Sequence, residues 1–300
     1  MNYKSKMAAA LFILLAMQPL WADDLETSVY FGNLGLPWGA APELDSLQHY
    51  PNNYWLYGVK TGFYKALGPG FFLNASYETD PVLKHLIRGI VSYESGIVSI
   101  EAGPMVGAFN NLENILKAGI HIGFSLELPG VVFASAIVES SMGAGLITKD
   151  DYFQEQADIK AGWYVYNAIC SLSILTKRLT SKAGTGQLIV DVSTDYTFSA
   201  DVHKKGSPYH INAELGYKAM TKTRDNTDTL GLGAIILGAE LGVDINSFLT
   251  VNAGLNSGVY VYGTEKLAGK GPLENSFMFS SSLGVVMHFP IKTVDESRAF

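Results

Sequence analysis

The feature that most constrains this chain is a two-residue alternation of apolar and polar side chains, sustained over long segments. Between Leu116 and Leu128 every even-numbered residue is apolar, and every odd-numbered residue is charged, polar or glycine. Successive side chains of a β-strand point to opposite faces, so this segment predicts a strand with one apolar and one polar face. The same division recurs within 188–198, 209–217 and 249–256.

The length of these segments and the low charge of the chain favour a membrane-spanning barrel. A strand of a soluble protein is usually about 5–6 residues long, whereas a tilted strand that crosses a bilayer needs about 9–11. Only 16% of the residues are charged, against roughly 25% in soluble domains. We therefore expect an all-β fold: a transmembrane, antiparallel, up-and-down β-barrel without a plug domain.

Alternation and turn residues together predict about fourteen strands, or twelve if the weakly alternating stretches 79–94 and 167–180 are not strands. The expected spans are 26–36, 54–66, 71–78, 86–94, 97–109, 115–128, 131–139, 156–167, 170–178, 186–198, 209–220, 229–243, 248–261 and 276–289. Long connections alternate with tight ones, as is typical of outer-membrane barrels, and 199–208 is the one long exception among the tight set. The alternation slips within 230–243, which predicts a bulge near Ala234–Ile236.

The first 22 residues have the features of a cleaved signal peptide. Lys4 and Lys6 precede the apolar run Met7–Leu20, and Ala22 completes a cleavage site. We expect 1–22 to be the signal peptide, 23–290 the outer-membrane β-barrel and 291–300 a C-terminal tail. The single cysteine cannot form an internal disulfide. The net charge of −7 argues against a nucleic-acid partner.

Taken together, these features resemble the outer-membrane β-barrels of Gram-negative (diderm) bacteria, and porin-like barrels in particular. The segment Phe277–Phe289 looks like the terminal strand that the barrel-assembly machinery reads, although a tail follows it. The resemblance implies an outer-membrane location, with lipid, lipopolysaccharide and the assembly machinery as partners, and it is compatible with a homo-oligomer. Fourteen strands also suit FadL-like hydrocarbon transporters, but their N-terminal hatch and Asn-Pro-Ala motif are not found here.

If the apolar faces meet lipid, the alternate positions line the lumen. The candidate lumen-lining residues carry both charges: Lys60, Arg88, Glu101, Lys117, His121, Glu127, Asp158, Lys160, Asp191, Asp195, His210, Glu214, Lys218 and Glu240. Their acidic excess predicts a mild preference for cations. Inward glycines such as Gly58 and Gly123 are expected to relieve crowding in a curved sheet, with an open passage as the alternative reason.

The sequence indicates no catalysis, cofactor or metal. Its histidines lack metal-ligand spacing, and the pair His210 and Glu214, on one strand face, lacks a nucleophile. An outer-membrane lipid hydrolase is the minor alternative.

The primary prediction for function is a porin-like channel that allows passive diffusion of small solutes through a polar, mixed-charge lumen. Two alternatives stay open. One is a non-conducting structural or surface-binding barrel whose external loops 37–53, 140–155 and 262–275 contact partners. The other is a FadL-like transporter of hydrophobic molecules, for which a lateral opening is expected.

Overall fold

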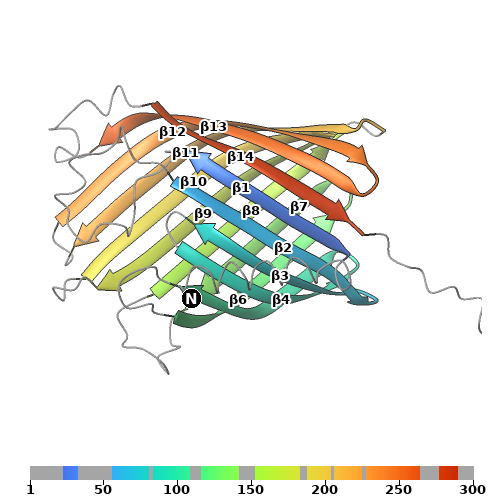
Figure 1. Cartoon of the computed structure of the whole chain (residues 1–300), viewed down its shortest axis with the longest axis horizontal. Coiled ribbons are helices and arrows are strands. Elements are labelled where there is room, and N and C mark those ends of the chain that lie inside the picture. The colour runs from blue at the N-terminus through green and yellow to red at the C-terminus, as the bar shows by residue number, and fades with distance from the viewer. Residues whose placement is uncertain are drawn as a thin grey trace, which may run out of the picture.

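The computed structural model is a closed barrel of fourteen antiparallel strands, in which the last strand pairs back with the first (Figure 1). It describes residues 23–32, 56–80, 84–108, 116–141, 153–182, 188–203, 206–224, 228–263 and 277–289. The strands are β1 (Asp24–Gly32), β2 (Leu56–Gly68), β3 (Phe71–Asp80), β4 (Lys84–Ser95), β5 (Val98–Ala108), β6 (Leu116–Leu128), β7 (Val132–Ser140), β8 (Phe153–Val165), β9 (Ala168–Lys182), β10 (Leu188–His203), β11 (Tyr209–Arg224), β12 (Asp228–Asn246), β13 (Leu249–Gly263) and β14 (Phe277–His288). Every regular element in these ranges is a strand, and none of them contains a helix able to cross a membrane.

Closure leaves no strand of the sheet with an unpaired edge. Leu25 of β1 lies opposite Met287 of β14 on one side and opposite Phe63 of β2 on the other. In a bilayer every backbone donor and acceptor needs a partner within the protein, which a closed ladder of strands supplies. The predicted all-β, fourteen-strand barrel is therefore confirmed.

One detail of the sequence prediction is wrong, and a second is only partly right. β10 continues to His203, so the connection expected at 199–208 shrinks to 204–208, between strands that pair as far as His203 and His210. The irregularity expected in β12 is a register shift against β13 between Gly233 and Ala234, where Val261 of β13 is left without a partner. The extra residue thus belongs to β13, while β12 stays in register with β11.

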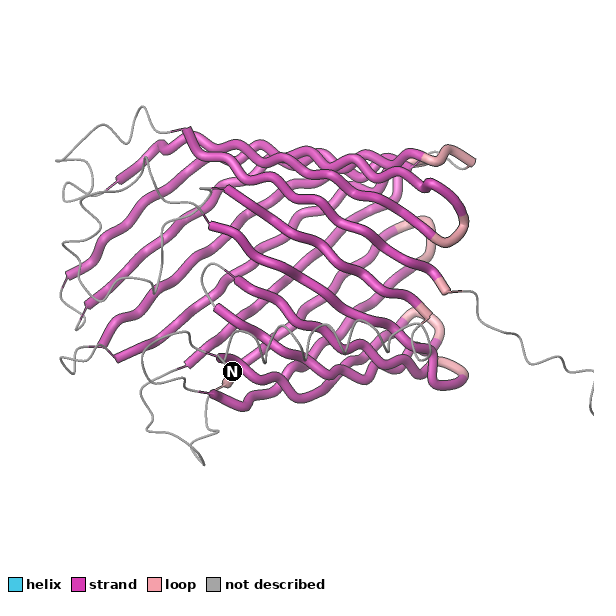
Figure 2. Tube along the Cα trace, in the orientation of Figure 1, coloured by secondary structure: helices cyan, strands magenta, loops and turns pink. Residues whose placement is uncertain are grey.

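The signal peptide 1–22, the tail 291–300 and most of the external loops 37–53, 140–155 and 262–275 lie outside the described residues. The short connections gather at one end of the barrel, which we call the turn end (Figure 2). Asp23 and Phe289, which flank the first and last strands, are joined there through a backbone hydrogen bond of 2.6 Å.

The register divides the side chains of each strand between an outward and an inward face. Outward positions are mostly apolar and freely accessible: Ile122, Leu215 and Leu255 are 54%, 52% and 57% exposed. A soluble protein does not surround itself with such a band, whereas hydrocarbon tails solvate it without cost. The sheet is therefore apolar on the outside.

The inward face is not uniformly polar, contrary to the simple two-face expectation. Leu86, Ile90, Met105, Leu179 and Met220 occupy inward positions and are buried. Alternation alone assigns these residues to the inward face together with their polar neighbours, but it does not explain why they are apolar. The inward face therefore combines charged side chains with apolar side chains that are themselves buried.

Candidate functional site

Five consecutive strands, β3 to β7, each contribute one ionisable side chain to a connected network on the lumen wall. Its members are Glu78, Arg88, Glu101, His121 and Glu139, and we call them the wall network. All five stand at inward register positions. Strands of a sheet are about 4.8 Å apart, so the network extends over roughly 19 Å of curved wall.

The centre of the network is a two-pronged ion pair between Arg88 and Glu139. Nε and Nη2 of Arg88 donate to the two carboxylate oxygens of Glu139 at 2.5 and 2.8 Å. The Arg88 side chain is 10% exposed and that of Glu139 is 2% exposed. A parallel fork of charge-assisted hydrogen bonds is the strongest geometry available to such a pair and fixes both side chains.

His121 continues the network on both sides of its ring. Nδ1 lies 2.7 Å from a carboxylate oxygen of Glu139, and Nε2 lies 3.1 Å from one of Glu101. An ionised carboxylate only accepts hydrogen bonds, so both ring nitrogens donate if both carboxylates are ionised, as in the imidazolium form. The network then holds two cations and three carboxylates, and it keeps a net negative charge.

Glu78 and Glu101 are the members that face the lumen most openly. Their side chains are 26% and 30% exposed, whereas that of His121 is 5% exposed. One carboxylate oxygen of Glu78 accepts a hydrogen bond of 2.9 Å from Nη1 of Arg88. Both carboxylates keep acceptor capacity beyond these bonds, because an ionised carboxylate has about four acceptor sites. They can therefore attract a passing cation.

Inward glycines give the polar side chains room to lie flat on the wall. A Cβ atom at Gly123 would overlap the Glu101 carboxylate, and one at Gly242 would overlap the His210 ring. A Cβ at Gly58 would overlap Tyr30 in the same way. These glycines therefore relieve crowding as expected, and by doing so they also keep neighbouring side chains out of the passage.

Other inward charges form smaller pairs. Nζ of Lys218 lies 2.7 Å from Asp195, and Nζ of Lys60 lies 3.5 Å from Glu26. Glu127 accepts a hydrogen bond of 2.5 Å from the hydroxyl of Tyr164. These pairs fix individual side chains but do not extend across several strands.

The structure places the predicted lumen residues at inward positions but joins only a few of them. Arg88, Glu101 and His121 belong to the wall network. The remainder are spread around the wall at Lys60, Glu127, Asp158, Lys160, Asp191, Asp195, His210, Glu214, Lys218 and Glu240. The Lys117 side chain lies outside the described residues.

Two members of the wall network, Glu78 and Glu139, were absent from the predicted lumen residues. Both fall at or beyond the ends of the segments expected as strands, where alternation is weakest. Both can be placed by counting every second residue forward along the sequence, from Asn74 to Glu78 and from Ser135 to Glu139. This count puts each on the inward face.

The strand ladder is interrupted between β4 and β5, beside Arg88. Arg88 pairs with Met105 and Val91 with Ala102, but Gly89, Ile90, Gly103 and Pro104 between them are unpaired across this junction, which we call the β4–β5 seam. Pro104 still pairs with Ile120 of β6, and it has no N–H to give to β4. A Cβ at Gly103 would overlap the Gly89 carbonyl, so the β4 backbone steps over the inward side of β5.

Within the described part of the chain, no group of three or more His, Cys, Asp or Glu side chains is arranged to hold a metal ion.

Comparison with known proteins identifies the architecture. No protein-family model matches the chain, and no curated protein is detectably similar in sequence. Among solved structures, a CymD monoaromatic hydrocarbon channel aligns with a TM-score of 0.51 at 12% identity, covering 92% of this chain and 90% of its own.

The fold is that of an outer-membrane β-barrel. A bacterial polysaccharide outer membrane secretin aligns with a TM-score of 0.49 at 11% identity, over 89% of this chain and 98% of its own. A Pseudomonas aeruginosa FadL homologue gives 0.49 at 10% identity, over 89% and 90%. The similarity to the CymD channel shows the fold alone, so the solute of this barrel has to be argued from its own wall.

Proposed function

We propose that this barrel is a porin-like channel that passes small polar solutes by diffusion and prefers cations. The observation that carries the proposal is the charge of the inward face. Among the side chains that the structure describes, the inward carboxylates are Asp24, Glu26, Glu78, Glu94, Glu101, Glu127, Glu139, Asp158, Asp191, Asp195, Asp201, Glu214, Glu240 and Asp244, and the inward lysine and arginine residues are Lys60, Arg88, Lys160, Lys177 and Lys218.

An acidic lining concentrates cations in the lumen and repels anions. Carboxylates that line a narrow pore set its ion preference, because the low-dielectric wall focuses their field into the water-filled path. Glu78 and Glu101 are exposed enough to act on a passing ion, while Arg88 and Glu139 largely neutralise each other. Glu78 and Glu101 of the wall network therefore support a preference of the channel for cations.

Reversal potentials in planar bilayers test this proposal. The refolded barrel is inserted under a KCl gradient, and the sign of the zero-current potential gives the preferred ion. We expect stable current steps and a potential of the sign set by potassium. A potential set by chloride would refute cation preference, and the absence of current steps from folded protein would favour the non-conducting, surface-binding alternative.

A second candidate function, carriage of hydrophobic molecules, is favoured by the β4–β5 seam together with the apolar inward residues. Leu86, Ile90 and Met105 adjoin the seam on the inward side. On the outward side, nothing lies within 4 Å of the position that a Cβ at Gly89 would take. An interrupted ladder with apolar side chains on its inward side, and with no atoms covering Gly89 on its outward side, is the place where an apolar solute could pass from lumen to bilayer.

A disulfide across the seam separates the two functions. In a Cys170→Ser background, Gly89→Cys with Pro104→Cys links β4 to β5, and Ala213→Cys with Ala239→Cys provides a matched link between the directly opposed positions of β11 and β12. If the seam is the route, oxidation of the first pair blocks uptake of a fluorescent hydrocarbon into vesicles and reduction restores it. Equal uptake in both oxidised variants would exclude the seam, while ion conduction through the lumen would be unaffected.

A further inference from the structure

One sector of the lumen wall presents hydrogen-bond acceptors without matching donors. Among the described residues, buried side-chain oxygens of Asp201, Asn212 and Asn252 have no hydrogen-bond partner. Asp201 of β10 lies opposite Asn212 of β11, which in turn lies opposite Glu240 of β12. Asn252 lies on β13, the next strand of the sheet. Buried polar groups of folded proteins nearly always have a partner, so three such oxygens in one sector call for an explanation.

Two further acceptor oxygens of this sector converge over a glycine. A Cβ atom at Gly238 would overlap Oδ1 of Asn256 and would lie 3.2 Å from Oε2 of Glu214. The other carboxylate oxygen of Glu214 accepts a hydrogen bond of 3.0 Å from Nδ2 of Asn212. The side chains that carry these oxygens all stand at inward positions, and we call them the acceptor patch: Asp201, Asn212, Glu214, Glu240, Asn252 and Asn256.

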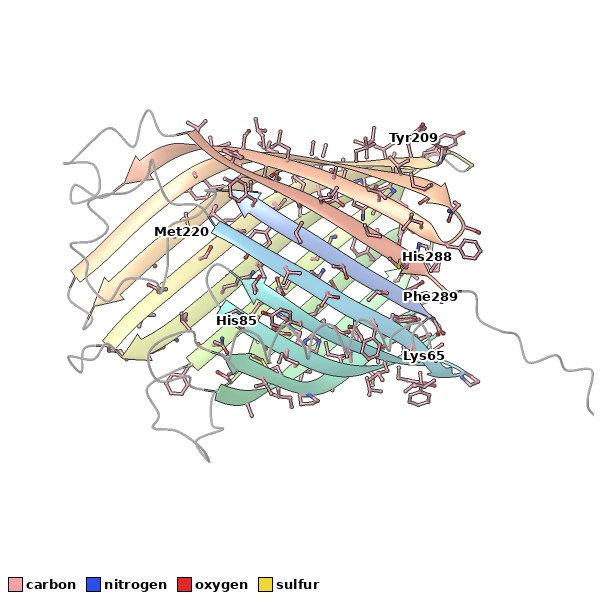
Figure 3. All side chains as sticks on the ribbon, viewed as in Figure 1. Lys65, His85, Tyr209, Met220, His288 and Phe289 are labelled. Carbon is pink, nitrogen blue, oxygen red and sulfur yellow. The ribbon has the colours of Figure 1, made fainter. Side chains whose placement is uncertain are left out.

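The acceptor patch lies in the half of the barrel next to the turn end. Asn212 and Glu214 follow Tyr209 along β11, which runs from the turn end toward Met220 (Figure 3). The patch extends over the four neighbouring strands β10 to β13, or roughly 14 Å of wall at the usual strand spacing. It is separate from the wall network, whose members stand on β3 to β7.

The acceptor patch is negatively charged, and no described side chain neutralises it. Its carboxylates, Asp201, Glu214 and Glu240, are half-buried and have no ion-pair partner among the described residues. Lys218, farther along β11, is already paired with Asp195 at 2.7 Å. No lysine or arginine occurs in the stretches that form the patch and its margins, 199–203, 210–214, 238–244 and 250–256. Partly buried carboxylates without a cation are costly, so a positively charged ligand would stabilise this part of the wall.

We propose that the acceptor patch binds a linear aliphatic diamine or polyamine. Ammonium groups supply both the positive charge and the N–H donors that the patch lacks. Asp201 and Glu240 stand two strand spacings apart, roughly 10 Å, so a matching ligand carries its charges apart on a chain. The described residues accordingly include no cluster of three ligands for a metal ion. Water molecules would supply donors but leave the carboxylates uncompensated. The inference rests on the proposed cation channel, which brings the ligand to the patch.

Single-channel recording with 1,5-diaminopentane tests this site. We expect the diamine to interrupt the potassium current, and 1-aminopentane, with one ammonium group, or Mg²⁺, with both charges at one point, to interrupt it much less. Asp201→Asn with Glu240→Gln should raise the dissociation constant of the diamine by about tenfold or more, because two charge-assisted contacts are lost. The matched control, Glu26→Gln with Glu127→Gln, removes two inward carboxylates outside the patch and should bind the diamine like the parent.

Isothermal titration calorimetry of the folded barrel in detergent measures the same binding without relying on conduction, and heat-dependent gel mobility identifies folded protein in each variant. An equal loss of affinity in the two double variants, or equal interruption by Mg²⁺ and the diamine, would overturn the inference and attribute the effect to total lumen charge. A barrel that prefers potassium but binds no diamine would also overturn it, while the proposed function would stand. Binding that is lost only in the patch variant, in a barrel without current steps, would support the site and refute the channel.

Discussion

Arg88 on β4 and Glu139 on β7 form a two-pronged ion pair although two strands, β5 and β6, lie between them. Three strand spacings amount to roughly 14 Å, so the two long side chains lie across the inner surface of the wall and meet over it. His121 of β6 and Glu101 of β5 join the pair from the strands beneath. Together, these four side chains connect β4, β5, β6 and β7 through contacts that the backbone hydrogen bonds of the sheet do not provide.

Removal of one partner of this pair should destabilise the barrel strongly. Arg88→Met leaves the Glu139 carboxylate buried with only His121 beside it, and breaking a buried pair costs about 3–5 kcal/mol. Urea unfolding from lipid vesicles measures the loss. Lys218→Met is the matched control, because Lys218 and Asp195 are 20% and 27% exposed and such a pair contributes roughly 1 kcal/mol or less.

The double variant Arg88→Met with Glu139→Met tests whether the cost comes from an uncompensated charge. It removes both charges, so its free energy of unfolding should lie above that of Arg88→Met alone. If the two single losses simply add in the double variant, the pair is not coupled and this account of it is wrong.

Glu78 and Glu101 should tune ion preference without affecting the fold. Replacing both by glutamine keeps their shape and removes two exposed negative charges, so the potassium-to-chloride permeability ratio should fall. Reversal potentials measure that ratio. Glu155→Gln is the control: its carboxylate pairs with Arg178 at 3.4 Å, and both residues stand at outward positions. An equal fall in both variants would mean that the effect does not act through the lumen.

A methyl group at Gly242 should narrow the channel. Because a Cβ there would overlap the His210 ring, Gly242→Ala drives the imidazole away from the wall and toward the lumen. We expect a lower single-channel conductance with unchanged ion preference. Gly89→Ala adds the same methyl group on the outer surface, where it meets nothing within 4 Å, and should conduct like the parent. Identical conductance of the two variants would show that His210 does not border the ion path.

Much of the fold could be predicted from the sequence, because a two-residue period determines both the strand and the face of each residue. The fourteen strands and the inward position of His121 follow from that period. The wall network does not follow, since whether Arg88 meets Glu139 depends on the stagger and curvature of four strands. The β4–β5 seam could not be predicted from alternation either. Pro104 falls on the apolar face, where its side chain fits the alternation, and only its missing N–H is unusual.

Closure of the barrel should depend on Asp23 in a pH-dependent way. Asp23 stands just before β1, and its carboxylate accepts hydrogen bonds from Lys65 Nζ at 2.8 Å and from the Ala66 backbone N–H at 2.7 Å. Its own backbone also bonds to Tyr64 of β2 and to Phe289, the residue that follows β14. The hydrogen bond from Lys65, helped by that from Ala66, lowers the pKa of Asp23 below its ordinary value despite partial burial.

A carboxyl with a lowered pKa in the folded state stabilises the fold above its unfolded pKa of about 3.9. That stability is lost as the pH falls through the lowered folded value. Urea midpoints of the barrel in detergent should therefore drop more steeply in acid for the parent than for Asp23→Asn, which cannot titrate. Lys65→Met should show the same flattened dependence, because it removes the main cause of the shift. A parent and an Asp23→Asn variant with parallel pH profiles would show that this carboxylate does not hold β1 between its two neighbours.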